Sequence, residues 1–196
     1  MTTYKVNEIF HTLQGEGYFV GTPSVFVRFS GCNLHCPFCD TAHDSGVMMT
    51  NEDILRSVAR FSARHVVLTG GEPSLFVTDE LLDGLHRIGR YIAIETNGTR
   101  PIPKSVDWIT LSPKDAWLPS PNARPVLDTC DELKVIFNGD EPPTYDHITA
   151  RHRFIQPCDT GNPSTNKIII DKAVAWCLFH PTWRLSLQTH KLINIP

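Results

Sequence analysis

Three closely spaced cysteines are the residues of this sequence best suited to chemistry. Cys32, Cys36 and Cys39 form a Cys-x3-Cys-x2-Cys run. Three thiolates can bind three irons of a four-iron cluster, which leaves the fourth iron without a protein ligand. An open coordination position distinguishes a reactive metal site from a closed one. The spacing therefore predicts a [4Fe-4S] cluster with one iron free to bind a small molecule.

S-adenosylmethionine carries groups that suit such an iron. Its amino and carboxylate groups can chelate the open position. An electron passed from the cluster into the sulfonium then breaks a C–S bond and releases an adenosyl radical. We therefore expect radical chemistry at a site built around the three cysteines.

Other interpretations of the cysteines stay open at this point. His35 lies within the run, so a Cys3His zinc site is an alternative, although the sequence has no second half-site. Simple burial of the three cysteines is a weaker alternative, because core cysteines do not need this spacing. We interpret Cys130, Cys158 and Cys177 as core or near-site residues rather than ligands.

A second loop of interest, Thr69-Gly70-Gly71-Glu72-Pro73, follows an apolar run. Two glycines allow a backbone to approach a ligand closely, and an exposed carbonyl or carboxylate can accept hydrogen bonds from an ammonium group. An ordinary turn is the structural alternative.

Short apolar runs and helical patterns alternate along the chain and must position these loops. Several runs are continuously apolar, as in strands covered on both faces. The expected strands are residues 24–29, 65–69, 91–96, 108–111, 132–136, 154–156 and 184–187. Residues 115–129 are expected to form a long surface loop, and residues 138–150 a crossover with little helix.

Three helices are expected between the strands. A capping box of Thr50 and Asp53 starts the first, Thr78 caps the second, and Asp171 starts the third, which ends before Pro181. The side chains expected to face the core are Ile54, Leu55, Val58 and Phe61, then Leu81, Leu82, Leu85 and Ile88, then Val174, Cys177 and Leu178.

This alternation predicts an α/β fold, a parallel sheet with helical crossovers. A chain of 196 residues suits one domain and is too short for eight β/α units. We therefore expect a single domain over residues 1–196, a partial, open TIM-like β/α barrel of about six parallel strands.

The composition argues against several classes of partner. The formal net charge is −3 and no basic run stands out, so we expect no nucleic-acid partner. No apolar stretch approaches membrane-spanning length, and no signal peptide follows Met1. We therefore expect a cytoplasmic protein with reduced thiols and no membrane partner.

The cysteine run and the Gly-Gly-Glu-Pro loop resemble the radical S-adenosylmethionine superfamily. Further motifs resemble one family within it, 7-carboxy-7-deazaguanine synthase. They are Leu13-Gln14-Gly15-Glu16-Gly17, Arg28, Cys39-Asp40-Thr41, Ile94-Glu95-Thr96-Asn97-Gly98, Ser112-Pro113-Lys114 and the ending Gln188-Thr189-His190-Lys191-Leu192-Ile193-Asn194-Ile195-Pro196. The opening and terminal motifs are the most specific to this family, and together the motifs extend over nearly the whole chain.

The resemblance implies a fold of the radical S-adenosylmethionine type and a ring contraction. In this family 6-carboxy-5,6,7,8-tetrahydropterin becomes 7-carboxy-7-deazaguanine and ammonia, on the route to queuosine and related 7-deazapurines. An adenosyl radical takes hydrogen from the pterin C6, S-adenosylmethionine is re-formed at the end, and Mg²⁺ assists. The resemblance also implies an electron donor, which the sequence does not identify, and a homodimer.

The resemblance also assigns roles to individual residues. The cluster ligands are Cys32, Cys36 and Cys39, and the magnesium ligand is Thr41. The cofactor contacts are Phe38, Cys39, Asp40, Gly71, Ser112, Pro113, Lys114, Gln156, Pro157, Cys158 and Asp159. The substrate contacts are Leu13, Gln14, Gly15, Arg28, Thr69 and Pro196.

Some of these residues also have structural interpretations. Thr41 offers the hard oxygen that Mg²⁺ prefers, or it caps the turn after Asp40. Arg28 lies on an apolar strand and needs an anion, either the substrate carboxylate or a structural partner such as Glu16 or Glu72. Residues 13–15, Ser112 and Lys114 could belong to ordinary solvated loops.

The last residue is expected to act through its terminal carboxylate. That group can accept two donors from an aminopyrimidine edge, and a frayed tail is the alternative. Leu192, Ile193 and Ile195 are apolar, which favours burial of the tail.

Two other functions compete with the synthase. A small glycyl-radical activase shares the cysteine spacing but needs a protein partner and no pterin contacts at the carboxyl terminus. A zinc-stabilised binding module would perform no chemistry.

Relative to the family, residues 43–49 form a short segment, which leaves open how the cluster is shielded and where an electron donor binds.

Overall fold

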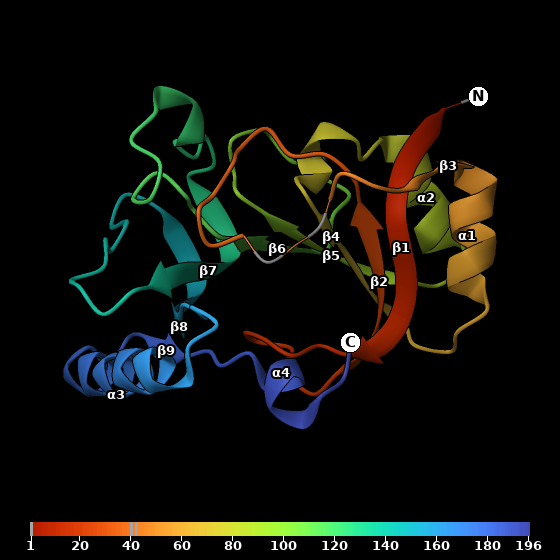
Figure 1. The fold of residues 1–196 in the computed structure, drawn as a ribbon. Helices are drawn as coiled ribbons and strands as arrows, with labels where there is room; N and C mark the ends of the chain where they lie inside the picture. The colour runs from red at the N-terminus through yellow and green to blue at the C-terminus, as the bar shows by residue number, and fades with distance from the viewer. Residues whose placement is uncertain (1, 40, 42) are drawn as a thin grey trace.

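The computed structural model describes residues 2–39, 41 and 43–196. Its strands form one sheet in the order β3-β1-β2-β4-β5-β6-β7-β8-β9 (Figure 1). The strands are β1 (Thr3–Leu13), β2 (Pro23–Phe29), β3 (Val47–Thr50), β4 (His65–Gly70), β5 (Tyr91–Thr96), β6 (Trp108–Leu111), β7 (Thr129–Phe137), β8 (Thr149–Pro157) and β9 (Arg184–Leu185). The helices are α1 (Asn51–Ala59), α2 (Asp79–Arg87), α3 (Pro163–Phe179) and α4 (Thr189–Ile193), with short 3-10 turns at Pro73–Leu75 and Pro121–Ala123.

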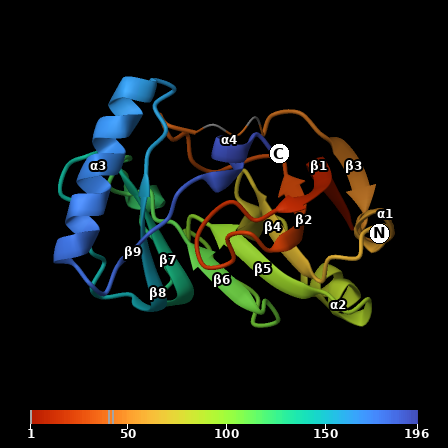
Figure 2. The same cartoon turned by 90° about the horizontal axis from the view of Figure 1, so that it is seen from below.

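The parallel part of the sheet confirms the predicted fold class. From β2 to β9 each neighbouring pair is parallel, and six of these strands have four or more residues while β9 has two. The edge strands β3 and β9 lie at opposite ends of the strand order, so within the described residues the sheet is open rather than closed. The sheet curves around a concave side in both views (Figures 1 and 2).

Two strands were missing from the sequence-based prediction, β1 and β3, and both are antiparallel. Along β1 only Tyr4 and Val6 are buried, and the other positions are half-buried or exposed. In β3, Val47 and Met48 are each 63% exposed. Such mixed burial gives a weak sequence signal, and it is the pairing with β2 that makes β1 a strand.

Helices α1 and α2 follow the predicted pattern. Thr50 and Asp53 form the capping box of α1, and Thr78 accepts a hydrogen bond from the Leu81 N–H at the start of α2. One predicted core residue is wrong, because Ile88 lies at the carboxyl end of α2 and is exposed.

The prediction for α3 was wrong in its start and in its buried face. The helix begins at Pro163 rather than Asp171, and the Asn162 side chain caps it. The residues that face the sheet are Ile169, Ala173 and Trp176, whereas Val174 and Leu178 are exposed and Cys177 is half-buried. This helix is apolar on more than one side, so residue spacing alone could not identify the side covered by β8 and β9.

Alternate residues of the parallel strands serve the two faces of the sheet. Val25, Val27, Val66, Leu68 and similar residues pack under α1 and α2.

On the concave face, Phe26, Val67, Ala93 and Trp108 are successive register partners and form a buried cluster, the apolar layer. Two residues closer to the carboxyl ends lie Arg28, Thr69, Glu95, Thr110 and Glu132, the polar layer. Residues two apart on a strand share a face, so the concave face of the sheet has an apolar level and, next to it, a polar level.

None of the helices in the described part of the chain is long and apolar enough to cross a membrane.

Candidate active site

A cavity of about 460 Å³ lies at the carboxyl ends of the parallel strands. Its size falls within the range of small-molecule sites. Arg28, Thr69, Glu95 and Thr110 of the polar layer form one wall, and the loops after β2, β4, β6 and β8 form the others. This is the end of a parallel sheet at which α/β proteins build their sites.

The cysteine loop follows β2 directly and lines this cavity. Cys32 and Cys36 are half-buried, and Cys39 is exposed. Burial raises the pKa of the Cys32 and Cys36 thiols, and the nearby Lys114 ammonium opposes that rise. A coordinating thiol is deprotonated, so cluster binding would replace these protons.

The three thiols fit a cluster better than a single ion. Among residues 2–39, 41 and 43–196, no three His, Cys, Asp or Glu side chains come close enough together to hold one metal ion. In a four-iron cluster each cysteine binds a different iron, so three thiols that line one cavity without meeting at one point suit it.

The Gly-Gly-Glu loop is joined to the start of the cysteine loop. The Gly71 N–H donates to the Phe29 carbonyl at 3.0 Å, and the Glu72 N–H donates to the Gly31 carbonyl at 2.9 Å. A Cβ atom at Gly71 would overlap the Gly31 carbonyl oxygen. Glycine is therefore needed here for two loops to meet at the cavity wall.

The carboxylate of Glu72 does not have the exposed position considered from the sequence. It is fully buried and accepts hydrogen bonds from the Thr96 hydroxyl at 2.6 Å and the Asn97 N–H at 2.7 Å. It also accepts from the Ser74 N–H. Glu72 thus ties the loops after β4 and β5 together, which leaves backbone carbonyls as acceptors for an ammonium group.

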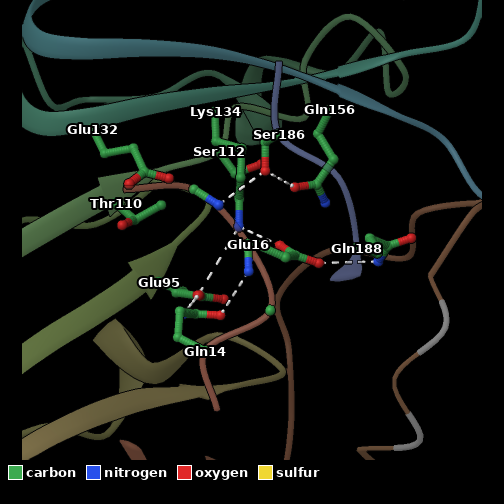
Figure 3. A network of polar contacts seen from close by, with 12 residues as sticks. Gln14, Glu16, Glu95, Thr110, Ser112, Glu132, Lys134, Gln156, Ser186 and Gln188 are labelled. Atoms are coloured by element: carbon green, nitrogen blue, oxygen red, sulfur yellow. Dashed lines mark hydrogen bonds and ion pairs between the residues drawn. The ribbon is translucent and has the colours of Figure 1, made fainter. Parts of the chain in front are cut away.

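Lys134 is the cation at the centre of the polar groups that line the cavity (Figure 3). Its Nζ lies 2.5 Å from Glu16 Oε2 and 3.9 Å from Glu95 Oε1. Burial alone would lower the pKa of Lys134, but Glu16, Glu95 and Glu132 raise it above its ordinary value. The ammonium therefore stays charged although the residue is buried.

The carboxylates around Lys134 are held in different protonation states. Burial would raise the pKa of Glu16, but Lys134 and the Gln188 amide hold it below its ordinary value. Burial raises the pKa of Glu132 to about 7, because Lys134 and the Tyr18 N–H offset only part of the desolvation. The cavity wall therefore has an ionised Glu16, whereas the Glu132 carboxyl, which does not line the described cavity, titrates near neutral pH.

The loop from Gln14 to Tyr18 is attached to this network along its whole length. The Gln14 amide donates to Glu95 Oε1 at 2.9 Å, and the Tyr18 N–H donates to Glu132 Oε2 at 2.9 Å. The Thr189 N–H and hydroxyl both donate to the Gly15 carbonyl. Two of the predicted substrate contacts, Gln14 and Gly15, thus lie on an ordered loop at the cavity, while Leu13 ends β1 and is exposed.

Arg28 has a different ion-pair partner from the two considered for it. Its Nε donates to Glu8 Oε1 on the neighbouring strand β1 at 2.8 Å, rather than to Glu16 or Glu72. The Arg28 side chain is 23% exposed and lines the cavity. The guanidinium has five donors, so the pair with Glu8 leaves donors for a second anion.

Two charged residues among the expected cofactor contacts are held by neighbouring groups. The Lys114 ammonium donates to the carbonyl and hydroxyl oxygens of Ser112, at 2.6 and 2.7 Å, and burial lowers its pKa to about 8. Asp159 forms an ion pair with Lys191 of α4 at 2.8 Å, and this bond holds the pKa of the carboxyl below its ordinary range.

The carboxyl-terminal tail reaches the cavity, but not by burying its apolar residues. Leu192 and Ile193 are 68% and 57% exposed, contrary to expectation, while Ile195 is half-buried. The tail is held by polar bonds instead, including one from the Ile195 N–H to the His190 carbonyl. Pro196 lines the cavity, and in both views the C-terminus lies beside β1 and β2 (Figures 1 and 2).

The structure brings most of the residues singled out from the sequence to one cavity. Those that line it are Cys32, Cys36, Cys39, Phe38, Thr41, Gly71, Ser112, Lys114, Gln156, Pro157, Cys158, Asp159, Leu13, Gln14, Gly15, Arg28, Thr69 and Pro196. Pro113 is buried next to them and does not line the described cavity. Asp40 lies outside the described residues.

Sequence reasoning gave no site role to several residues that line this cavity. They are Glu16, Glu95, Lys134, Gln188 and His190. A signal existed for two of them, because Glu95 and Lys134 are charged residues inside predicted strands, where an unpaired charge is costly. His190 packs on Gly15, where a Cβ atom would overlap its ring.

Comparisons with known proteins agree with this geometry. A family model described as "Radical SAM superfamily" matches residues 26–115. A 7-carboxy-7-deazaguanine synthase of Bacteroides thetaiotaomicron is 50% identical, over 97% of this chain and 98% of that protein. One of Nitratidesulfovibrio vulgaris is 40% identical, over 99% and 100%.

This chain belongs to the 7-carboxy-7-deazaguanine synthase family. The solved structure of QueE from Escherichia coli is 30% identical, with a TM-score of 0.73 over 96% of this chain and 95% of that one. Family membership confirms the resemblance seen in the motifs. It also confirms the radical S-adenosylmethionine fold, with a [4Fe-4S] cluster and S-adenosylmethionine as cofactors. Family membership therefore favours the synthase over the glycyl-radical activase and the zinc-stabilised binding module.

Proposed function

We propose that this chain catalyses the ring contraction of 6-carboxy-5,6,7,8-tetrahydropterin to 7-carboxy-7-deazaguanine, with release of ammonia, in 7-deazapurine biosynthesis. One observation carries the proposal. The cysteine loop and a buried wall of carboxylates, amides and a lysine face the same cavity in a chain that is 50% identical to such a synthase over nearly its full length.

When bound, the cluster and S-adenosylmethionine supply an adenosyl radical. The chain's own residues position the reactants and exclude water. Phe38, Gly71, Ser112, Lys114 and the segment from Gln156 to Asp159 support the cofactor proposal by lining the side of the cavity near the thiols. Asp40 and Pro113 belong to the same proposal through the family motif alone.

The pterin is proposed to bind against the Gln14 loop and the carboxyl-terminal tail. The contacts proposed for it are Leu13, Gln14, Gly15, Arg28, Thr69 and Pro196, all of which line the cavity. Arg28 can hold the substrate carboxylate with the donors that Glu8 does not use. The Pro196 carboxylate can accept from an aminopyrimidine edge.

The finer parts of the proposal concern the surroundings of the reaction. Mg²⁺ is assigned to the Thr41 hydroxyl together with oxygens of the substrate, since Mg²⁺ prefers oxygen ligands. The chain is proposed to act as a cytoplasmic homodimer that accepts electrons from a reduced donor protein, without a nucleic-acid or membrane partner. The free cysteines support a reducing compartment.

The test is an anaerobic assay of reconstituted protein with S-adenosylmethionine, Mg²⁺, a reductant and the carboxylated tetrahydropterin. We expect the deazaguanine acid and ammonia in equal amounts, without net consumption of S-adenosylmethionine. Omitting Mg²⁺ should lower the rate. Absence of product from protein with an intact cluster would contradict the proposal.

A further inference from the structure

Ser186 is a buried residue that no sequence motif singled out, and its hydroxyl joins two sides of the cavity wall (Figure 3). It follows β9 and is 3% exposed. Its Oγ accepts a hydrogen bond from the Gly17 N–H at 2.9 Å and donates to Gln156 Oε1 at 2.9 Å. Its own N–H donates to the Ile155 carbonyl, which fixes Ser186 against β8.

These bonds set the direction of the Gln156 side chain. The Gly17 N–H can only donate, so the single hydrogen of the Ser186 hydroxyl is directed at Gln156, which must present its oxygen. The amide nitrogen of Gln156 is then turned toward Glu16, whose carboxylate it contacts. The hydroxyl and the Glu16 carboxylate therefore orient the amide together, because the hydroxyl donates to its oxygen and the carboxylate accepts from its nitrogen.

The same hydroxyl holds the turn that carries the proposed pterin contacts. Gly17 has a φ of +64°, and a Cβ atom there would overlap Glu132 Oε1, so the turn packs directly on the Glu132 carboxyl. Its polar anchors are Ser186 at Gly17 and Glu132 at Tyr18. Ser186 is thus the point at which the Gln14 loop and β8 meet.

We propose that Ser186 is a positioning residue that orients the Gln156 amide and the Gly17 turn together, so that the pterin side and the cofactor side of the cavity keep one relative arrangement. The inference rests on the proposed function. Because it acts through Gln156, its effect depends on that residue.

A double-mutant cycle of Ser186→Ala and Gln156→Leu tests this dependence. In Ser186→Ala we expect the KM for the pterin to rise about tenfold, within the range expected for loss of the two hydrogen bonds that the buried hydroxyl makes, with a smaller fall in kcat. Displaced substrate should also increase the deoxyadenosine released per product. In the Gln156→Leu background only the bond from the Gly17 N–H is left to lose, so the same change should alter each quantity clearly less than it does with Gln156 present.

Ser24→Ala is the matched control. Ser24 is also a fully buried serine, and its hydroxyl contacts His65 and the Thr22 carbonyl at the other end of the sheet. We expect it to lower the melting temperature about as much as Ser186→Ala and to leave KM and the deoxyadenosine ratio unchanged. Equal kinetic effects of both serine variants, or additive effects in the cycle, would overturn the proposal.

Failure of the proposed function can be told apart from failure of this inference. If wild-type protein binds S-adenosylmethionine but forms no deazaguanine, the proposed reaction is wrong. The cycle is then read from the S-adenosylmethionine dissociation constant, measured by equilibrium dialysis with and without the pterin. Loss of the pterin's effect on that constant in Ser186→Ala supports the positioning role, and an unchanged effect overturns it.

Discussion

The apolar layer and the polar layer of this protein lie two residues apart on the same strands and have opposite chemistry. Phe26, Val67, Ala93 and Trp108 are buried together and packed by Phe19, whose ring lies 4.7 Å from that of Trp108. One step toward the carboxyl ends, the same strands present charged and hydroxyl side chains to the cavity.

The difference separates what stabilises the fold from what serves the reaction. Each fully buried apolar side chain contributes about 1.5–3 kcal/mol. A buried ion pair has a desolvation cost of several kcal/mol per ion, which its attraction offsets only with good geometry. The polar layer is therefore poor as a source of stability, and its position at the cavity points to binding. Changes in the two layers should have different consequences.

The largest effect is expected at the cysteine loop above the polar layer. Cys36→Ala leaves two thiolates for the cluster, so turnover should fall below detection. The apolar layer is untouched, so circular dichroism should show a folded protein. Iron and sulfide analysis after anaerobic reconstitution provides the measurement. Full activity with normal iron content would contradict the assignment of Cys36.

Removal of Ile195 and Pro196 should also abolish turnover of the pterin. The deletion moves the terminal carboxylate from Pro196 to Asn194, which does not line the described cavity, while the tail's anchor at Asp159 and Lys191 remains. Product formation is the measurement, and Leu192→Ser, a change at an exposed position of the same tail, is the control. Normal turnover of the shortened chain would show that the tail takes no part.

Lys134→Met tests the charged network that the polar layer residue Glu95 shares with Lys134 and Glu16. The change leaves these two half-buried carboxylates without their cation, which should cost about 3 kcal/mol of unfolding free energy or less. Displacement of these side chains should lower kcat/KM about 100-fold. Urea unfolding and steady-state kinetics measure the two effects, and a loss of stability without a loss of activity would assign Lys134 a structural role only.

Val67→Ala makes the opposite test in the apolar layer. Val67 is fully buried, so we expect a loss of about 2 kcal/mol in unfolding free energy. Its side chain lies one level away from the cavity, so kcat/KM below the melting transition should stay within about twofold of wild type. A large kinetic effect here would show that the two layers are not independent.

The smallest effect is the pH dependence contributed by Glu132. Burial raises its pKa from 4.5 to about 7, so the native state holds a proton that the unfolded state has released. Stability therefore falls as the pH rises from about 4.5, and the fall ends above the folded pKa. Relative to Glu132→Gln, wild type should lose about 1 kcal/mol between pH 6 and 8.

Urea unfolding at both pH values measures this difference. Glu52→Gln, a change at an exposed residue in the first turn of α1, serves as control and should follow wild type. Parallel curves for wild type and Glu132→Gln would show that Glu132 is not protonated near neutral pH.

Much of this protein could be predicted from the sequence because the signals are local. Continuous apolar runs marked the parallel strands, Thr50 and Thr78 marked two helix starts, and the cysteine spacing marked the cluster loop. The errors arose where an element's structure depends on the elements that it pairs with or packs against. The strand β1 depends on its pairing with β2, and the inner face of α3 depends on the strands that it covers.

The sequence by itself determined the cysteine spacing, the alternation along each strand and hence the existence of two chemically different levels. Only the tertiary structure decided which side chains meet. Glu16, Glu95 and Lys134 come from three distant segments, and Arg28 pairs with Glu8 rather than with the partners considered for it. The physical reason is that strand register and sheet curvature, which depend on long-range contacts, set the distances between charges.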